Sequence, residues 1–129
     1  MTIAVICSAL LGLLLMSLGF GVSMVRGRTE KLIGHSTDPE DPVHKIVRAH
    51  GNTAEYAPML AVLMLLAARF DPGTWVLWVM AIGTAARFVI VLGLMIGSLE
   101  KPNAFRFAGA ALTYVAGIVL SMNILVNAA

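Results

Sequence analysis

The sequence is poor in charged residues and contains a single cysteine. Charged residues make up 12% of its 129 residues, whereas hydrophobic residues make up 59%. A soluble domain of this length could not bury so much apolar surface, so the composition excludes a water-soluble globule. Because Cys7 stands alone, an intramolecular disulfide and a cysteine-based metal site are excluded as well, and we expect it to pack in an apolar helix.

Several catalytic and binding signatures are missing. The chain has no Ser-His-Asp arrangement, no pair of catalytic carboxylates and no glycine-rich phosphate loop. His44 and His50 are six residues apart, which is poor spacing for two ligands on one helix face, and no metal site is expected even with His35. The net charge of +2 comes without a basic patch interleaved with aromatic residues, so no nucleic-acid partner is expected.

Long apolar runs are what the sequence has in abundance. A spanning helix needs about 20 residues, and four runs reach that length: about Ile3–Val25, His44–Phe70, Thr74–Ile96 and Ala104–Val126. The short connections between the last three leave no room for a soluble domain. We therefore predict an all-α fold in which residues 1–129 form one integral membrane domain, a four-helix bundle with helices at about 3–25, 43–70, 74–97 and 104–127.

Local signals indicate where these helices begin and how they pack. Asp41 is a suitable N-cap with Pro42 at the first helical position, so the second helix should start before the membrane. Asp71-Pro72-Gly73 predicts a tight reversal, and Pro102-Asn103 marks the last turn. The small-residue runs at 83–86 and 108–111 favour close packing of the helices that carry them.

The basic residues predict the orientation in the membrane. Both termini lack basic side chains. Most of the basic residues lie in or beside the two connections at 26–48 and 98–106: Arg26, Arg28, Lys31, Lys45, Arg48, Lys101 and Arg106. The positive-inside rule then puts both connections in the cytoplasm and both termini on the other side. In a bacterium, the membrane would be the cell inner membrane.

A polar stripe begins the second apolar run. Arg48, Asn52 and Glu55 are spaced by four and three residues, which brings their side chains onto one helix face. Counting back about 20 residues from Phe70 reaches Gly51, so Asn52 and Glu55 are expected within the membrane. Ionisable groups at that depth cost about 2.5–3.5 kcal/mol each, and a functional role is the default interpretation.

Glu55 and Arg87 are the ionisable residues that a solvated surface explains least well. Arg87 lies near the middle of the third apolar run, so both side chains should point into protein or a watery cleft. An ion pair between them is within reach, and it would either lock helices or subunits together or belong to a ligand site. In the second case, Asn52 and the nearby arginines could form a cleft for an anionic small molecule with carboxylate and amide groups. These arginines are Arg48, Arg87 and Arg106.

The run around the polar stripe resembles a known family signature. Residues 47–58 read VRAHGNTAEYAP and match the pattern R-x-x-x-N-x-x-E-x-x-P at all four fixed positions. This is similar to the MAPEG family, the membrane-associated proteins in eicosanoid and glutathione metabolism. Ala86-Arg87 resembles a pair of residues in the third helix of family members. Pro102-Asn103 looks like the turn before the fourth helix of microsomal glutathione transferases.

The resemblance implies a homotrimer with glutathione sites at subunit interfaces, reached from the cytoplasm. It assigns glutathione binding to five residues: Arg48, Asn52, Glu55, Tyr56 and Arg87. Arg106 is the nearest candidate for the catalytic arginine that stabilises the glutathione thiolate, which would attack a hydrophobic small molecule arriving from the lipid bilayer. Glutathione would thus be a co-substrate, and no protein nucleophile is needed.

One departure from the family pattern keeps other functions open. Many active members carry a tyrosine about seven residues after the helix-three arginine, and here that position is Leu94. A glutathione transferase or peroxidase is therefore one hypothesis, and a non-catalytic member that binds a lipid or a partner protein is the other. A small multidrug transporter is disfavoured because residues 1–25 contain no carboxylate.

Overall fold

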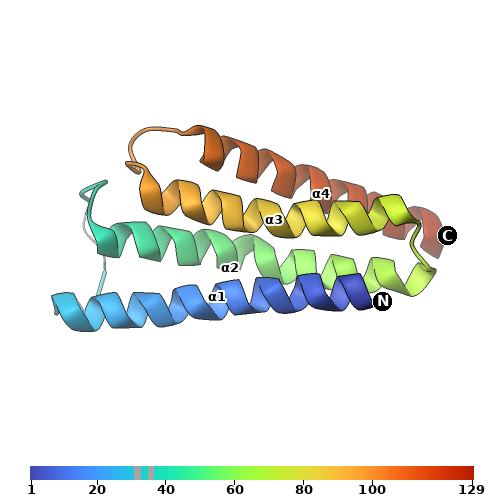
Figure 1. Ribbon diagram of the computed structural model, residues 1–129, viewed down its shortest axis with the longest axis horizontal. Helices are drawn as coiled ribbons and strands as arrows, with labels where there is room; N and C mark the ends of the chain where they lie inside the picture. Colours follow the sequence, from blue (N-terminus) through green and yellow to red (C-terminus); the bar gives the residue numbers. More distant parts are fainter. Residues whose placement is uncertain (31–32, 35–36) are drawn as a thin grey trace.

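Long helices lie side by side along one axis (Figure 1). The computed structural model describes residues 1–30, 33–34 and 37–129. Within these residues the four α-helices are α1 (Thr2–Thr29), α2 (Pro42–Ala67), α3 (Thr74–Ile96) and α4 (Ala104–Ala128), and a short 3-10 helix, η1 (Ala68–Phe70), continues α2. Lys31 and His35, which the sequence analysis considered, lie outside the described residues.

All four helices are long and apolar enough to cross a membrane, in agreement with the predicted all-α fold. Both termini lie at one end of the bundle, and the α1–α2 and α3–α4 connections lie at the other (Figure 1). The first helix runs to Thr29, beyond the predicted end near Val25. Arg26 and Arg28 in its last turn suit the partial negative charge at a helix C-terminus, and the helix ends where Glu30 turns left-handed, with φ of 56°.

The predicted cap of α2 is confirmed. The backbone N–H of Val43 donates to the Asp41 carboxylate at 2.7 Å, and Pro42 is the first helical residue. The cap satisfies a donor that has no partner inside the helix, and proline loses nothing at a position whose N–H is unpaired anyway. At the other turn, Asp71 adopts the left-handed conformation that the chain reversal requires.

Small residues bring α3 and α4 into close contact. A Cβ atom added at Gly109 would come within 2.7 Å of both the backbone nitrogen and the Cβ of Ile90. Gly83 is similarly tight against the methyl group of Ala116, at 2.9 Å. The predicted role of the small-residue runs is thus confirmed, since helices in a membrane approach closely where side chains are absent.

The two connections at the end opposite the termini are held together. The backbone N–H of Leu99 donates to the carbonyl of Pro39 at 3.2 Å. Beside this bond, the Lys45 ammonium donates to the Glu40 carboxylate at 2.7 Å. Hydrogen bonds from Lys45 and from the Ser98 hydroxyl lower the pKa of Glu40 below its ordinary value. Pro39 and Glu40, at the end of the α1–α2 connection, therefore lie against the turn that leads into α4.

The glycine contact between α3 and α4 gives a test of the packing. Gly109→Ala should lower the free energy of unfolding by about 1–3 kcal/mol, because the new methyl group meets backbone that cannot move aside. Gly12→Ala is the matched control, since nothing lies within 4 Å of its added Cβ, and it should stabilise the helix by about 0.5–1 kcal/mol. Thermal unfolding in detergent measures both, and equal effects would contradict the close contact.

Candidate functional site

A buried arginine links α3 to α2. Arg87 is 1% exposed. Its Nη2 donates to both oxygens of Asn52, to the backbone carbonyl at 2.9 Å and to the side-chain amide oxygen at 2.7 Å. Hydrogen bonds to a charged group contribute about 1.5–3 kcal/mol each, so these two bonds offset much of the cost of burying the guanidinium. Among the described residues, its Nε is buried without a hydrogen-bond partner.

The partner of Arg87 differs from the one that the sequence predicted. No ion pair between Glu55 and Arg87 is found within the ranges that the structure describes, and Asn52 takes that place. Glu55 lies on the exposed surface of α2 within a single chain, although its negative charge still attracts the guanidinium. The physical reason is that Asn52 presents both of its oxygens to Arg87, whereas Glu55, three residues further along α2, is exposed.

Tyr56 continues the cluster toward α4. The guanidinium carbon of Arg87 lies 5.3 Å from the centroid of the Tyr56 ring, within the range of a cation–π interaction. The Tyr56 hydroxyl is 3.2 Å from the hydroxyl of Tyr114. Their ring centroids are 5.5 Å apart at an interplanar angle of 64°, an edge-to-face contact. A chain of contacts therefore runs from Asn52 through Arg87 and Tyr56 to Tyr114. We call these four residues the Arg87 cluster.

Sequence reasoning missed Tyr114. Tyr56 and Tyr114 are the two tyrosines of the chain, and Tyr114 stands alone as a polar ring inside an apolar run. That isolation is the signal that could have identified it, since a phenol in a spanning helix needs a hydrogen-bond partner. Its partner lies 58 residues away on α2, and this pairing follows only from the packing of α4 against α2.

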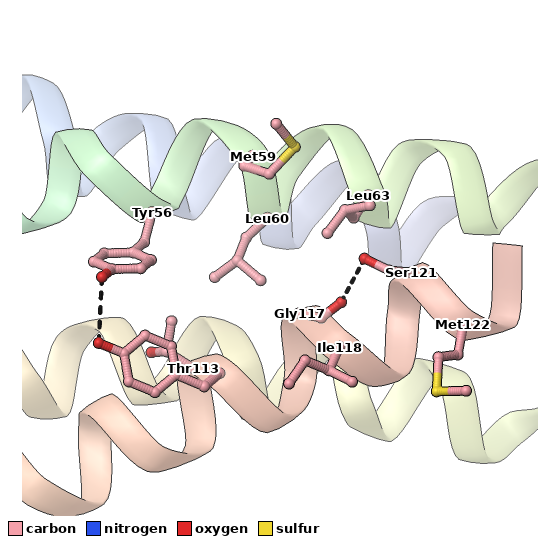
Figure 2. Close-up of a pocket in the computed structure, with 10 residues that line it drawn as sticks. Tyr56, Met59, Leu60, Leu63, Thr113, Gly117, Ile118, Ser121 and Met122 are labelled. Carbon is pink, nitrogen blue, oxygen red and sulfur yellow. Dashed lines mark hydrogen bonds between the residues drawn. The ribbon is translucent and has the colours of Figure 1, made fainter. Parts of the chain in front are cut away.

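An apolar groove of about 460 Å³ runs along α2 and α4 from the tyrosine pair (Figure 2). Its walls include Leu60 and Leu63 from α2 and Ile118 and Met122 from α4. The hydroxyl of Ser121 donates to the carbonyl of Gly117 at 2.8 Å, and that of Thr113 donates to Gly109 at 2.7 Å. Since these two hydroxyls are satisfied by their own helix, the tyrosines form the polar end of the groove.

Arg48 and Arg106, the other predicted site residues, lie apart from these contacts. Arg48 is exposed on α2, one turn before Asn52. Arg106 is half-buried at the start of α4, and its Nη1 donates to three carbonyls of the preceding turn: Ser98 at 3.5 Å, Leu99 at 3.2 Å and Lys101 at 3.0 Å. Hydrogen bonds among the described residues do not connect Arg106 to the Arg87 cluster.

Leu94, which stands where the family pattern has a tyrosine in the third helix, is a core residue. Leu94 is 6% exposed and packs in a cluster with Leu18, Ala49 and Ile90. A side chain at this position is therefore buried within a single chain. In the part of the chain that the structure describes, no group of three or more histidine, cysteine or carboxylate side chains could hold a metal ion.

The Arg87 contacts lead to a double-mutant cycle. Asn52→Ala removes one acceptor from a buried charge and should cost about 1.5–3 kcal/mol of unfolding free energy. Combined with Arg87→Met, it should show a coupling of about 0.5–3 kcal/mol, as expected for residues in contact. The matched cycle of Glu55→Gln with Arg87→Met should give a smaller coupling. Denaturation in detergent measures both cycles, and a larger coupling through Glu55 would restore the direct ion pair.

Comparison with known proteins agrees with the fold and with the motif on α2. The family model described as the MAPEG family matches residues 4–126, nearly the whole chain. No curated protein is significantly similar to it in sequence. The matched region contains α2 and α3 in full, nearly all of α1 and α4, and every residue of the Arg87 cluster. The chain therefore belongs to the MAPEG family.

Proposed function

We propose that the protein binds glutathione and directs its thiolate at hydrophobic electrophiles, as a glutathione transferase or peroxidase. The family includes glutathione transferases along with other members. The observation that carries the proposal is the position of Arg87. A guanidinium held inside the bundle by a neutral amide keeps its positive charge, and Tyr56 connects it to an apolar groove. A buried positive charge and an apolar groove therefore lie next to each other, joined by Tyr56.

The residues of α2 fit the chemistry of glutathione. The exposed guanidinium of Arg48 suits a carboxylate, and the exposed carboxylate of Glu55 suits an ammonium group. Asn52 offers an amide for the peptide bonds, although its side-chain oxygen is already used by Arg87. The orphaned Nε of Arg87 is a further buried donor without a partner, as expected of a residue that helps to hold an anionic ligand.

Arg106 is the proposed catalytic arginine. Among the described residues, Nη1 alone is engaged by the carbonyls of the turn, so Nε and Nη2 keep donors that can serve a sulfur anion. A guanidinium near the sulfur favours the thiolate, which is the nucleophilic form. The turn would hold Arg106 in place, and the thiolate would then attack an electrophile seated in the groove.

We also propose a homotrimer, with a second copy facing the polar stripe. Arg48 and Glu55 are exposed in the single chain. Charged side chains at membrane depth face protein or water rather than lipid, so this face of α2 needs a polar partner. The ligand site would then lie between chains and open toward the cytoplasm.

A non-catalytic lipid-binding or partner-binding protein is the second candidate. Its support is specific: Leu94 fills the core where a ligand-contacting tyrosine is expected, and Arg106 is tied to turn carbonyls. The groove along α2 and α4 would hold a lipid equally well without any reaction. Glutathione binding separates the two candidates.

Calorimetry in detergent should detect glutathione binding by the wild-type protein, and native mass spectrometry of the same sample should show the trimer. Arg48→Lys should weaken that binding about 10-fold or more, because lysine cannot reproduce a bidentate contact worth about 1.5–3 kcal/mol. Arg28→Lys, at the exposed end of α1, is the control and should leave the affinity unchanged. A folded wild-type protein that binds no glutathione would contradict the proposal and favour the second candidate.

We further propose that both termini lie outside the cytoplasm, because the basic residues gather around the connections at the opposite end of the bundle. A reporter that works only in the cytoplasm should stay silent when fused after Ala129. The same reporter fused after Glu100, between α3 and α4, should be active. The opposite pair of signals would reverse the topology and place the polar stripe on the other side of the membrane.

A further inference from the structure

The two phenols at the polar end of the groove share one hydrogen bond. Their oxygens are 3.2 Å apart, and either could be the donor. Each phenol has one proton to donate. Whichever hydroxyl accepts the shared bond therefore keeps its own proton for a third group. That proton is presented where the polar cluster meets the apolar groove.

The position of Arg87 favours one of the two phenols as the donor of the shared hydrogen bond. The guanidinium lies over the ring of Tyr56 and not over that of Tyr114. A cation at this place draws electron density from the Tyr56 phenol, which makes its hydroxyl the better donor and the poorer acceptor. This argument makes Tyr56 the donor of the shared bond and leaves the O–H of Tyr114 for a third group. The Tyr114 side chain is 50% exposed on the groove wall, so this O–H is accessible.

From this geometry we infer that Tyr114 is a catalytic acid, which protonates the oxygen of a hydrophobic electrophile as glutathione attacks it. The inference rests on the proposed function and adds the residue that supplies the proton. A long-chain epoxide is the simplest probe, because its reacting oxygen must gain a proton. Tyr56 and Arg87 assist, because a donated hydrogen bond and a nearby positive charge both stabilise the phenolate that Tyr114 becomes.

The step balances without a further reactant. The thiol proton of glutathione is lost to water when the thiolate forms. The sulfur then bonds to a ring carbon of the epoxide, the carbon–oxygen bond breaks, and its electron pair stays on the oxygen. That oxygen takes the proton of Tyr114, and the phenolate is reprotonated by water. An aryl halide needs no such proton, because its leaving group departs as a stable halide anion.

Two electrophiles therefore test the role of Tyr114. Tyr114→Phe keeps the ring and the groove but removes the proton, and general acid catalysis contributes about 10²–10⁴-fold. We expect its kcat/KM to fall by about 100-fold or more for the epoxide of a long-chain alkene. For 1-chloro-2,4-dinitrobenzene the fall should be at least 10-fold smaller than for the epoxide, because that reaction needs no proton and loses only the contact with the hydroxyl, roughly 10-fold or less. Ser23→Ala, which removes a hydroxyl bonded to Gly19 on α1, is the control and should change neither rate.

A binding measurement checks the hydrogen bond without any turnover. An unreactive long-chain ketone presents an oxygen to Tyr114, and the alkane of equal length does not. Tyr114→Phe should weaken binding of the ketone by about 3- to 10-fold, the loss of one neutral hydrogen bond, and leave the alkane unchanged. Ligand-observed NMR in detergent measures both, and glutathione calorimetry on the variant confirms that it is folded.

The outcomes separate this inference from the function on which it rests. An unchanged epoxide rate in Tyr114→Phe, or an equal loss with both electrophiles, overturns the role of Tyr114 and leaves the transferase standing. A wild-type protein that turns over neither electrophile overturns both. If Tyr114→Phe does not fold, the wild-type rates in heavy water decide the question. A slower reaction with the epoxide and not with the aryl halide supports the inference, and equal isotope effects overturn it.

Discussion

The contact between Arg87 and Asn52 is the interaction on which the arrangement of this bundle depends. A guanidinium inside an apolar helix is costly in a membrane, and hydrogen bonds to Asn52 offset part of that cost. Two hydrogen bonds from one nitrogen, at 2.9 and 2.7 Å, fix the depth and the rotation of α2 against α3. The same rotation brings the Tyr56 ring to the guanidinium and its hydroxyl to Tyr114. Losing this contact would therefore disturb each step of the cluster.

The choice of a neutral partner for Arg87 has a consequence for ligands. A carboxylate in contact with the guanidinium would cancel its charge, whereas the amide of Asn52 positions the group and leaves the charge in place. Glu55 lies on the same helix but on its exposed surface, where it attracts Arg87 without a contact. The interior of the bundle thus carries a positive charge next to a neutral, apolar groove. That combination suits an anionic nucleophile better than a purely structural ion pair would.

The sequence was sufficient to predict the helices, because apolar length and caps are local properties. The Asp41 cap, the turn at Asp71 and the small-residue contacts at Gly109 all follow from residue types at fixed spacing. The partner of Arg87 could not be predicted in this way. Asn52 and Glu55 are three residues apart on one face, and charge alone favours Glu55. Only the relative rotation and depth of two packed helices decide between them.

The contact of Tyr114 with Tyr56 could not be predicted from the sequence either. Its partner is 58 residues distant, so no spacing rule connects the two hydroxyls. For Arg106, the sequence showed that it follows the turn before α4. It did not show that Arg106 donates hydrogen bonds to three carbonyls of that turn. In both cases the residue type and the helix were readable from the sequence. The contact was not, because it depends on how separate segments meet in space.

The unequal packing of α4 against its neighbours explains why a groove exists at all. Toward α3, glycines at 83 and 109 let the backbones approach until almost no space is left. Toward α2, α4 presents Tyr114, Ile118 and Met122, whose bulk holds the two helices apart. Beyond the tyrosine pair these side chains line the groove without filling it. The groove is therefore a consequence of where the small residues stand on α4, and the hydroxyl pair closes it at the end nearest the buried charge.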